Sequence, residues 1–512
     1  MDESRLLSGR HLFIVVAALL LSLALIAVDQ TIVATALPVI TSHFNALQDV
    51  TWIVGGYLLT TVSFMPTYGQ LLAIFQTKWV YMIAIIIFEL GSLFCAVAPS
   101  ANFLIFGRAF AGMGAAGISV SVLTILTEST ELRHRALVFG AIGVLFSVSS
   151  IVGPLNRFLT NKNPGAFTAH LTWRWCFYIN LPLGVVSCLI IFFSLPVHKP
   201  LVSYSDPMTI TKRLKTMDWI GVIQIGCLLC LATTVMLVLP LEWGGSTRPW
   251  NSSVVVVLLC VCVILLMALL VWEWHQGENG IIPLKVLGRR TQIGGCIVMF
   301  FTMFDMLVFT YYIPLLYQAV FDRSPIRSGV DMLPFLISTV VTTIVTSAFI
   351  ARTGHYWTVL VMGPALCCVA GGLLSTITET MSNAKLIGYQ ILYGVGIGST
   401  MQNAFMALQA DADLKTVPVC NAIASFMQIL GGFVGVTVAG AIFNNQLRKN
   451  LSIYAPDVDP GPVTASVAAI YSILSPQSRQ SVIHAYVKSL DYVFLTAVPC
   501  GALTIFGAAC MR

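Results

Sequence analysis

Four ionisable side chains lie inside long apolar stretches of this sequence, where such groups are rare. They are Asp29, Glu89, Arg108 and Asp305. An ionisable group at membrane depth costs at least about 2.5 to 3.5 kcal/mol, so each one needs a reason. A carboxyl group there can carry a proton, because burial favours its neutral form and contact with water favours its ionised form. The three acids are therefore candidate proton-coupling residues.

Arginine keeps its proton in proteins, so Arg108 has a different predicted role. Its charge can bias a neighbouring carboxylate or a bound water molecule. We predict that Arg108 is a switch element and not the proton carrier. Structural roles are the alternatives for the acids. Asp29 could cap or pack a helix end, and Asp305 could accept a hydrogen bond from Thr302 or Thr310 within a helical bundle.

Polar and aromatic side chains in the same stretches could line a substrate cavity. Amides and rings on an otherwise apolar wall suit amphipathic organic molecules better than sugars or inorganic ions. Ordinary hydrogen bonding between helices is the alternative for each residue. The candidates are Trp52, Tyr57, Tyr311, Tyr312, Gln318, Gln402, Asn403, Asn421 and Gln428.

The composition predicts that these residues are held in a membrane. Of the 512 residues, 57% are hydrophobic and only 9% are charged, whereas a soluble domain carries about 25% charged residues. The apolar residues form blocks of about 20, the length that crosses a hydrocarbon core of about 30 Å. Continuous apolar blocks favour helices over a β-barrel, which needs alternation. The first block, from His11 to Pro38, is too long for a signal-peptide core and is predicted to stay as an anchor.

We predict fourteen spans, which place both termini on one side of the membrane. The distribution of Lys and Arg puts that side in the cytoplasm. Two N-glycosylation patterns agree with this topology. Asn251 and Asn450 each begin an N-x-S motif in a loop that is predicted to lie outside.

Several classes of function are disfavoured by what the sequence lacks. No G-x-x-x-x-G-K-[ST] pattern occurs, which argues against an ATP-driven pump. The net charge of +6 is spread over short loops and does not predict nucleic-acid binding. Cys227 and Cys230 have a C-x-x-C spacing but no second pair or nearby His, so we expect no metal or cofactor. The His residues are scattered, which disfavours a membrane-embedded enzyme.

Four stretches of the N-terminal half carry longer motifs. Residues 28–38 read VDQTIVATALP, residues 107–117 read GRAFAGMGAAG, Gly140, Ser149, Gly153 and Pro154 share one predicted span, and residues 173–182 read WRWCFYINLP. The C-terminal half adds Tyr311–Pro314, Arg352–Gly354 and Gln428–Gly432. These stretches resemble the motifs of the major facilitator superfamily, in its fourteen-span drug:proton antiporter branch and its fungal toxin and multidrug efflux type.

This resemblance implies two six-helix bundles, with two inserted central helices, around a midplane cavity that opens alternately. The implied divisions are residues 1–195 for the first bundle, 196–275 for a cytoplasmic linker and the inserted spans, and 276–512 for the second bundle, with a long outer loop at 446–488. It also implies that Arg108 belongs to a motif associated with proton coupling. Glu89, in the third span, is implied to lie peripheral to the cavity.

The resemblance further implies a gating motif at Gly140, Gly153 and Pro154. Two departures from the family pattern affect gating. After Gly69, the places usually taken by an acidic and a basic residue hold Ala73 and Ile74, although Lys78 is kept. The gating motif normally ends in a pair of glycines, and here it continues into Asn156-Arg157.

The sequence therefore predicts a proton-coupled secondary transporter that exports small amphipathic organic molecules by alternating access. The resemblance implies a drug, toxin or secondary metabolite as substrate. An importer of a small organic solute and a transporter-derived receptor or sensor with impaired flux are the alternatives. The expected partners are the small-molecule substrate, protons and the lipid bilayer, and we expect a monomer. The expected location is the plasma membrane, with vacuolar or vesicle membranes as alternatives.

Overall fold

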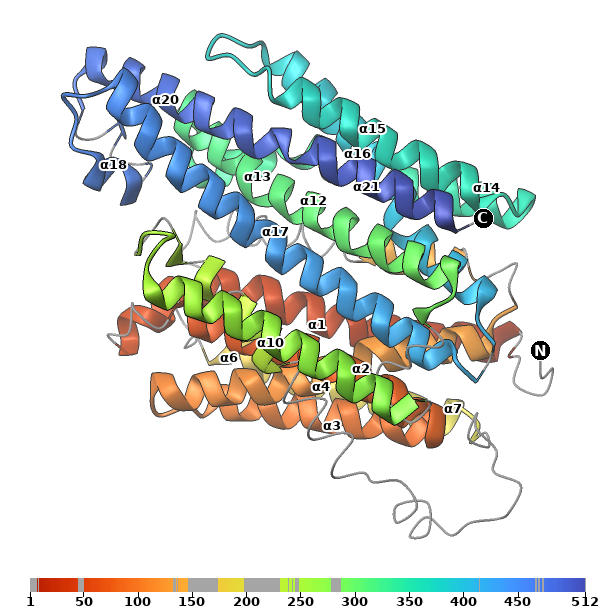
Figure 1. Cartoon of the computed structure of the whole chain (residues 1–512). Helices are drawn as coiled ribbons and strands as arrows, with labels where there is room; N and C mark the ends of the chain where they lie inside the picture. The colour runs from red at the N-terminus through yellow and green to blue at the C-terminus, as the bar shows by residue number, and fades with distance from the viewer. Residues whose placement is uncertain are drawn as a thin grey trace.

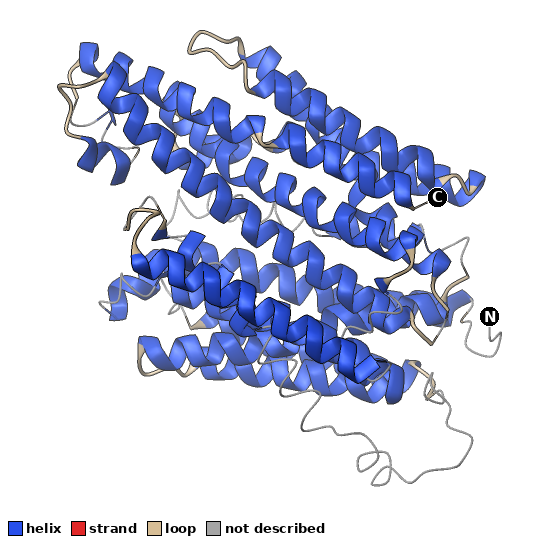
Figure 2. Cartoon of the chain, viewed as in Figure 1, coloured by secondary structure: helices blue, strands red, loops and turns tan. Residues whose placement is uncertain are grey.

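In the computed structural model, the described residues lie mostly in long helices (Figure 2). The structure describes residues 7, 9–44, 50–131, 135, 137–145, 174–197, 231–237, 239–241, 243–244, 248–277, 287–413, 415–465, 467, 470–471 and 474–511. Within these residues every named element is an α-helix. The predicted all-α architecture is therefore confirmed.

The helices fall into an N-terminal half, a central helix and a C-terminal half (Figure 1). The N-terminal half contains α1 (Gly9–Phe44), α2 (Val50–Ile74), α3 (Thr77–Ala96), α4 (Ala101–Ser129), α6 (Trp175–Tyr178) and α7 (Asn180–Ser194). The central helix is α10 (Ser253–Gln276). The C-terminal half contains α12 (Arg290–Phe321), α13 (Pro325–Val330), α14 (Leu333–Thr353), α15 (Tyr356–Leu374), α16 (Asn383–Asp411), α17 (Val417–Tyr454), α18 (Pro460–Ala465), α20 (Pro476–Leu495) and α21 (Ala497–Cys510).

Local sequence explains where several helices begin. Ser100 precedes α4, and its hydroxyl accepts a hydrogen bond from the backbone N–H of Phe103. Ser252 does the same for α10 by accepting from Val255. Such caps satisfy backbone groups that a helix start leaves unpaired. The sequence therefore marks the residues at which α4 and α10 begin.

Ten helical segments within the described residues are long and apolar enough to cross a membrane. Together with the more polar α2 and α16, they account for twelve of the predicted fourteen spans. The predicted fifth and seventh spans lie largely outside the described residues. Both the start of α1 and the end of α21 lie on the right of Figure 1, as an even number of spans requires, and we refer to this as the terminal side.

The predicted outer loop at 446–488 is wrong in its extent. Helix α17 continues to Tyr454 and α20 already begins at Pro476. The extension is polar in sequence, but Phe443, Leu447 and Leu451 repeat every four residues and are all buried. This apolar stripe packs against α20 and keeps the segment helical.

The two halves share a core at one end only, within the described residues. One apolar cluster joins N-terminal residues such as Phe139 to Met299, Phe405 and Ala422 of the C-terminal half. These three residues lie at the terminal-side ends of α12, α16 and α17. At the opposite end, the described cores are separate: one cluster belongs to α12–α21 and another to the N-terminal half.

Candidate functional site

Asp29 and Arg108 form an ion pair inside the N-terminal half. The Arg108 Nη1 group donates to Asp29 Oδ2 at 2.6 Å, and the side chains of Arg108 and Asp29 are only 3% and 1% exposed, respectively. Helices α1 and α4 bring the two residues together across 79 positions of sequence. The pairing satisfies two charges that would each be costly alone in a membrane.

Arg108 has two further partners on α2. Its Nε donates to the backbone carbonyl of Ile53 at 3.4 Å, and its guanidinium carbon lies 4.2 Å from the centre of the Tyr57 ring. Cation–π contact of this kind stabilises a desolvated arginine. Tyr57 was predicted to line a substrate cavity. The structure places its ring against the ion pair.

Asn180 completes this polar group and was not among the predicted site residues. Its Nδ2 group donates to Asp29 Oδ1 and to the Ser92 hydroxyl, at 3.3 Å each. Asn180 is fully buried at the start of α7. The sequence contained a signal for it, because Asn180 belongs to the motif at residues 173–182.

Asp305 is a buried acid on α12 with a different environment. It is 3% exposed, and its Oδ1 atom has no hydrogen-bond partner within the described part of the chain. The structural alternative for this residue is not observed. The Thr302 hydroxyl is also without a partner there, and Thr310 donates to the backbone carbonyl of Met306. Tyr393 contacts only the Asp305 backbone, donating to its carbonyl at 3.2 Å.

Glu89 lies on α3 against Gly184 of α7. Both of its carboxylate oxygens are buried, and neither has a hydrogen-bond partner among the described residues. A Cβ atom added at Gly184 would collide with this carboxylate. Glu89 is therefore enclosed between two helices of the N-terminal half.

The other predicted cavity residues do not gather at one place. Asn403 and Gln318 make direct hydrogen bonds, to Thr346 at 3.1 Å and Ser328 at 3.0 Å. Asn421 accepts from Gln409 at 2.8 Å. These bonds match the alternative of ordinary hydrogen bonding. The remaining candidates are Tyr311, 61% exposed; Tyr312, buried against Phe443; Gln402, buried; Gln428, half-buried; and Trp52, whose side chain lies outside the described residues.

Close contacts between the halves lie on the terminal side. The rings of Phe139 and Phe405 stack with centroids 6.2 Å apart and an interplanar angle of 7°. A Cβ atom at Gly140 would lie 3.2 Å from Ser347 Cβ. Gly140 was predicted to belong to a gating motif, and here it permits close approach to α14. The other two predicted motif residues, Gly153 and Pro154, lie outside the described residues.

The departure at Ala73 has a structural counterpart at the same end. Ala73 packs in an apolar cluster with Val419 and Ile423 at the start of α17. One turn earlier, a Cβ at Gly69 would lie 2.5 Å from Ala422 Cβ. The ends of α2 and α17 therefore meet through small apolar residues at the place where the family pattern has charged ones.

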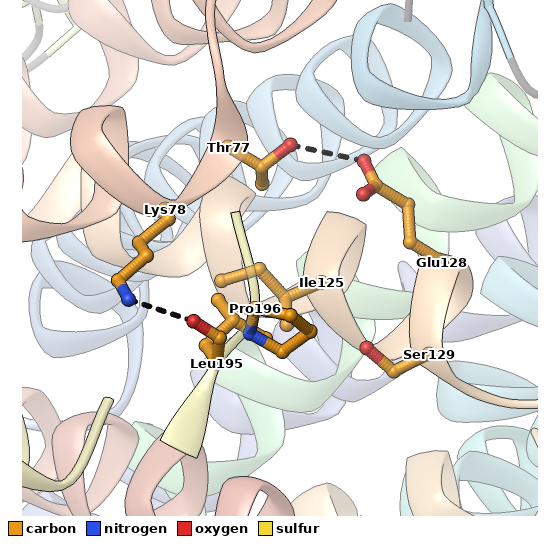
Figure 3. Close-up of a pocket in the computed structure, with 7 residues that line it drawn as sticks. All are labelled: Thr77, Lys78, Ile125, Glu128, Ser129, Leu195 and Pro196. Carbon is orange, nitrogen blue, oxygen red and sulfur yellow. Dashed lines mark hydrogen bonds between the residues drawn. The ribbon is translucent and has the colours of Figure 1, made fainter. Parts of the chain in front are cut away.

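A small pocket lies between α3, α4 and the end of α7 on the terminal side (Figure 3). The Lys78 ammonium reaches across it and donates to the backbone carbonyls of Phe192 at 2.6 Å and Leu195 at 2.7 Å. Thr77 donates to Glu128 at 3.0 Å. Lys78 thus satisfies carbonyl groups that the end of α7 leaves unpaired. The lining residues are Thr77, Lys78, Ile125, Glu128, Ser129, Leu195 and Pro196.

The two predicted glycosylation sites differ in the structure. Asn251 is exposed in the turn before α10. Asn450 lies inside α17, is 7% exposed, and donates its amide to Ser489 at 3.0 Å. The predicted loop position of Asn450 is therefore wrong, because the buried stripe of α17 extends past it.

Two groups of long apolar helices, with an ion pair buried inside the N-terminal half, define a polytopic membrane protein. A model of the Major Facilitator Superfamily matches residues 19–436. The chain belongs to this superfamily, whose members are transporters and not enzymes.

Curated relatives cover nearly the whole chain. The chain is 34% identical over 511 residues to the efflux pump aflT of Aspergillus parasiticus, across 99% of this chain and 96% of that protein. It is 35% identical to the MFS-type efflux pump MFS1 of Arthroderma benhamiae, across 99% and 92%. It is also 35% identical to the aspyridones efflux protein of Neocamarosporium betae, across 98% and 87%.

Solved structures share the fold at low sequence identity. The human organic anion transporter MFSD10 superposes with a TM-score of 0.62 at 14% identity, covering 98% of this chain and 100% of that one. The proton:xylose symporter XylE superposes with a TM-score of 0.61 at 11% identity, covering 99% and 95%. These likenesses confirm the predicted major facilitator fold.

Proposed function

We propose that this protein is a proton-coupled exporter of small amphipathic organic molecules, of the secondary-metabolite, toxin or drug class. The observation that carries the proposal is the buried Asp29–Arg108 ion pair, together with the buried acid Asp305, whose Oδ1 has no hydrogen-bond partner among the described residues. The names of the relatives support export: three of them are efflux proteins, and one of these is named for aspyridones. The plasma membrane is the site that we propose for this activity.

The ion pair links proton binding to a change in packing. A proton on Asp29 would remove the negative charge that holds the Arg108 guanidinium at 2.6 Å. Arg108 would then rest on the Ile53 carbonyl and the Tyr57 ring alone. Both of these groups belong to α2, so protonation would weaken the link between α1 and α4 and leave the link to α2 in place.

Asp305 supplies a second proton-binding group in the other half. An ionised carboxylate without a cation or a donor costs several kcal/mol in a membrane, whereas the neutral acid is tolerated there. Asp305 would therefore hold a proton while it is enclosed, and release it only when the surrounding helices admit water. We assign Arg108 the switch role, and Asp29 and Asp305 the role of proton carriers.

The energy available from protons is sufficient for export. One proton that moves down a potential of 100 mV provides about 2.3 kcal/mol, and each pH unit adds about 1.36 kcal/mol. A free energy of about 2.3 kcal/mol supports a substrate gradient of roughly 50-fold. Proton coupling alone can therefore drive the proposed export.

The arrangement of the halves is consistent with one state of an alternating-access cycle. Phe139, Gly140 and Gly69 contact the C-terminal half on the terminal side. We propose that this side is the cytoplasm and that it is closed in this conformation. In this proposal residues 1–195 and 276–512 are the bundles that rock against each other, and residues 196–275 carry the linker and the inserted spans.

Transport by purified protein in liposomes with an imposed pH gradient tests the function. Wild-type protein should move a fluorescent amphipathic substrate against its gradient and take up protons as it does so. Asp29→Asn, Asp305→Asn and Arg108→Ala should lose proton-driven transport, whereas the control Asp457→Asn, at an exposed acid, should keep it. Normal pumping by all three variants would contradict the assignment. Substrate binding without flux in wild type would indicate a receptor, and the opposite direction of flux an importer.

A further inference from the structure

A column of polar side chains runs along the interface between α1, α3 and α7. It lies within the N-terminal half, away from the contacts between the two halves. Its first level is the group already described, in which Asn180 bonds both Asp29 and Ser92 at 3.3 Å. All three residues are at most 1% exposed.

The second level is Glu89, one helical turn closer to the terminal side. Glu89 precedes Ser92 by three residues on α3, and its neighbour Gly184 follows Asn180 by four residues on α7. Asp29 and Cys188 are titratable groups within electrostatic reach of Glu89. Both oxygens of the Glu89 carboxylate are enclosed and have no hydrogen-bond partner among the described residues.

The third level consists of three hydroxyl groups. Ser22 Oγ lies 2.5 Å from the Tyr81 hydroxyl and 2.6 Å from Ser187 Oγ. The Tyr81 hydroxyl lies 3.5 Å from Ser187 Oγ. A hydroxyl group both donates and accepts a hydrogen bond, so connected hydroxyls can pass a proton along.

The fourth level is the pocket on the terminal side (Figure 3). Lys78, which lines it, precedes Tyr81 by one turn of α3 and bonds the end of α7. On α7, Asn180, Gly184 and Ser187 are three to four residues apart, and helical steps of this size are about 4.5 to 6 Å. One water molecule can bridge such a distance. The column thus leads from Asp29 towards the terminal side, in steps of about one turn along α7 as far as Ser187 and by one further turn of α3 from Tyr81 to Lys78.

Resting on the proposed function, we propose that this column is the route by which protons leave Asp29 for the terminal side, and that Glu89 is its intermediate proton-holding residue. Glu89 first releases its proton through the hydroxyl groups to water at the pocket. The Glu89 carboxylate then receives the proton of protonated Asp29 through a bridging water molecule, because Asn180 Nδ2 donates to both Asp29 and Ser92 and cannot accept a proton itself. Asp29 is left ionised and pairs with Arg108 again, so each proton that enters at Asp29 leaves at the pocket. While Asp29 is ionised and paired with Arg108, it has no proton to give to the column, so the column does not conduct protons.

The test measures proton uptake and substrate movement together in liposomes that contain the full chain. Glu89→Gln should lose transport driven by a pH gradient but keep substrate counterflow, which needs no net proton movement. Tyr81→Phe, which removes one hydroxyl group of the third level, should slow proton uptake several-fold and leave counterflow unchanged. Glu379→Gln, at an acid in the connection between α15 and α16, is the control and should resemble wild type.

Full proton-driven transport in Glu89→Gln would overturn the proposed route. If Glu89→Gln does not fold, Gly184→Ala and Tyr81→Phe decide: reduced proton uptake with retained counterflow supports the route, and unchanged proton uptake in both overturns it. A wrong proposed function gives a different result, because the wild-type protein itself would then show no proton-driven transport. That result would also contradict the proposed proton route.

Discussion

Asp29 and Arg108 are joined by a 2.6 Å ion pair although neither side chain is more than 3% exposed. Each charge in this pair depends on the other, because both side chains are buried away from solvent. Tyr57, Ile53 and Asn180 surround the pair with groups that match its charges. The consequences for stability and for transport can be separated by experiment.

Removal of one partner of the ion pair should destabilise the protein more than removal of both. Arg108→Ala leaves a buried carboxylate without compensation, which costs about 3 to 5 kcal/mol. The double variant Asp29→Asn with Arg108→Ala should recover much of this loss, because no buried charge remains. Thermal unfolding in detergent measures the difference. Equal unfolding temperatures for the single and double variants would argue against a tightly coupled pair.

A disulfide between Gly140→Cys and Ser347→Cys should stop transport. The Cβ position at Gly140 lies 3.2 Å from Ser347 Cβ, close to the range that a disulfide requires. The bond would hold the two halves together on the terminal side, so that substrate could no longer enter from there. Reduction should restore transport, and each single cysteine variant should be active throughout. Undiminished transport by the fully cross-linked protein would contradict alternating access at this contact.

A larger side chain at Gly69 should open the same end. Val at this position would collide with Ala422 and push α2 away from the start of α17. Cys420, which is 2% exposed, should then react faster with a thiol reagent, as followed by mass spectrometry. Gly55→Val is the matched control on α2, because an added Cβ there meets nothing within 4 Å. An unchanged rate at Cys420 would show that this contact does not close the terminal side.

Only one of the two predicted N-glycosylation sites should carry a glycan. Asn251 is exposed, whereas the Asn450 amide is buried and bonded to Ser489. After expression in a eukaryotic host, Asn251→Gln should abolish the mass shift on enzymatic deglycosylation. Asn450→Gln should have no effect on that shift. Loss of the glycan in Asn450→Gln alone would contradict the buried position, and absence of any glycan in wild type would contradict the proposed sidedness.

The sequence by itself determined the helical membrane architecture. Its apolar blocks have the length of a bilayer core, and a chain in lipid must satisfy its backbone hydrogen bonds internally. The cost of charge in such blocks also marked Asp29, Glu89, Arg108 and Asp305 as unusual before any contact was known. The sequence predicted the ends of the helices less accurately than their number and type. The end of α17 was missed because its buried stripe of Phe443, Leu447 and Leu451 lies among polar residues that lower the local hydropathy.

Only the tertiary structure decided which of these groups meet. Asp29 bonds Arg108 across 79 residues and Asn180 across 151. No local pattern encodes such distances, because they depend on how helices far apart in sequence pack against one another. The same packing left Asp305 Oδ1 without a hydrogen-bond partner in the described part of the chain and set Glu89 in a polar column between α1, α3 and α7. Residue type limits what a buried group can do, and the neighbours that packing supplies decide which of those roles it takes.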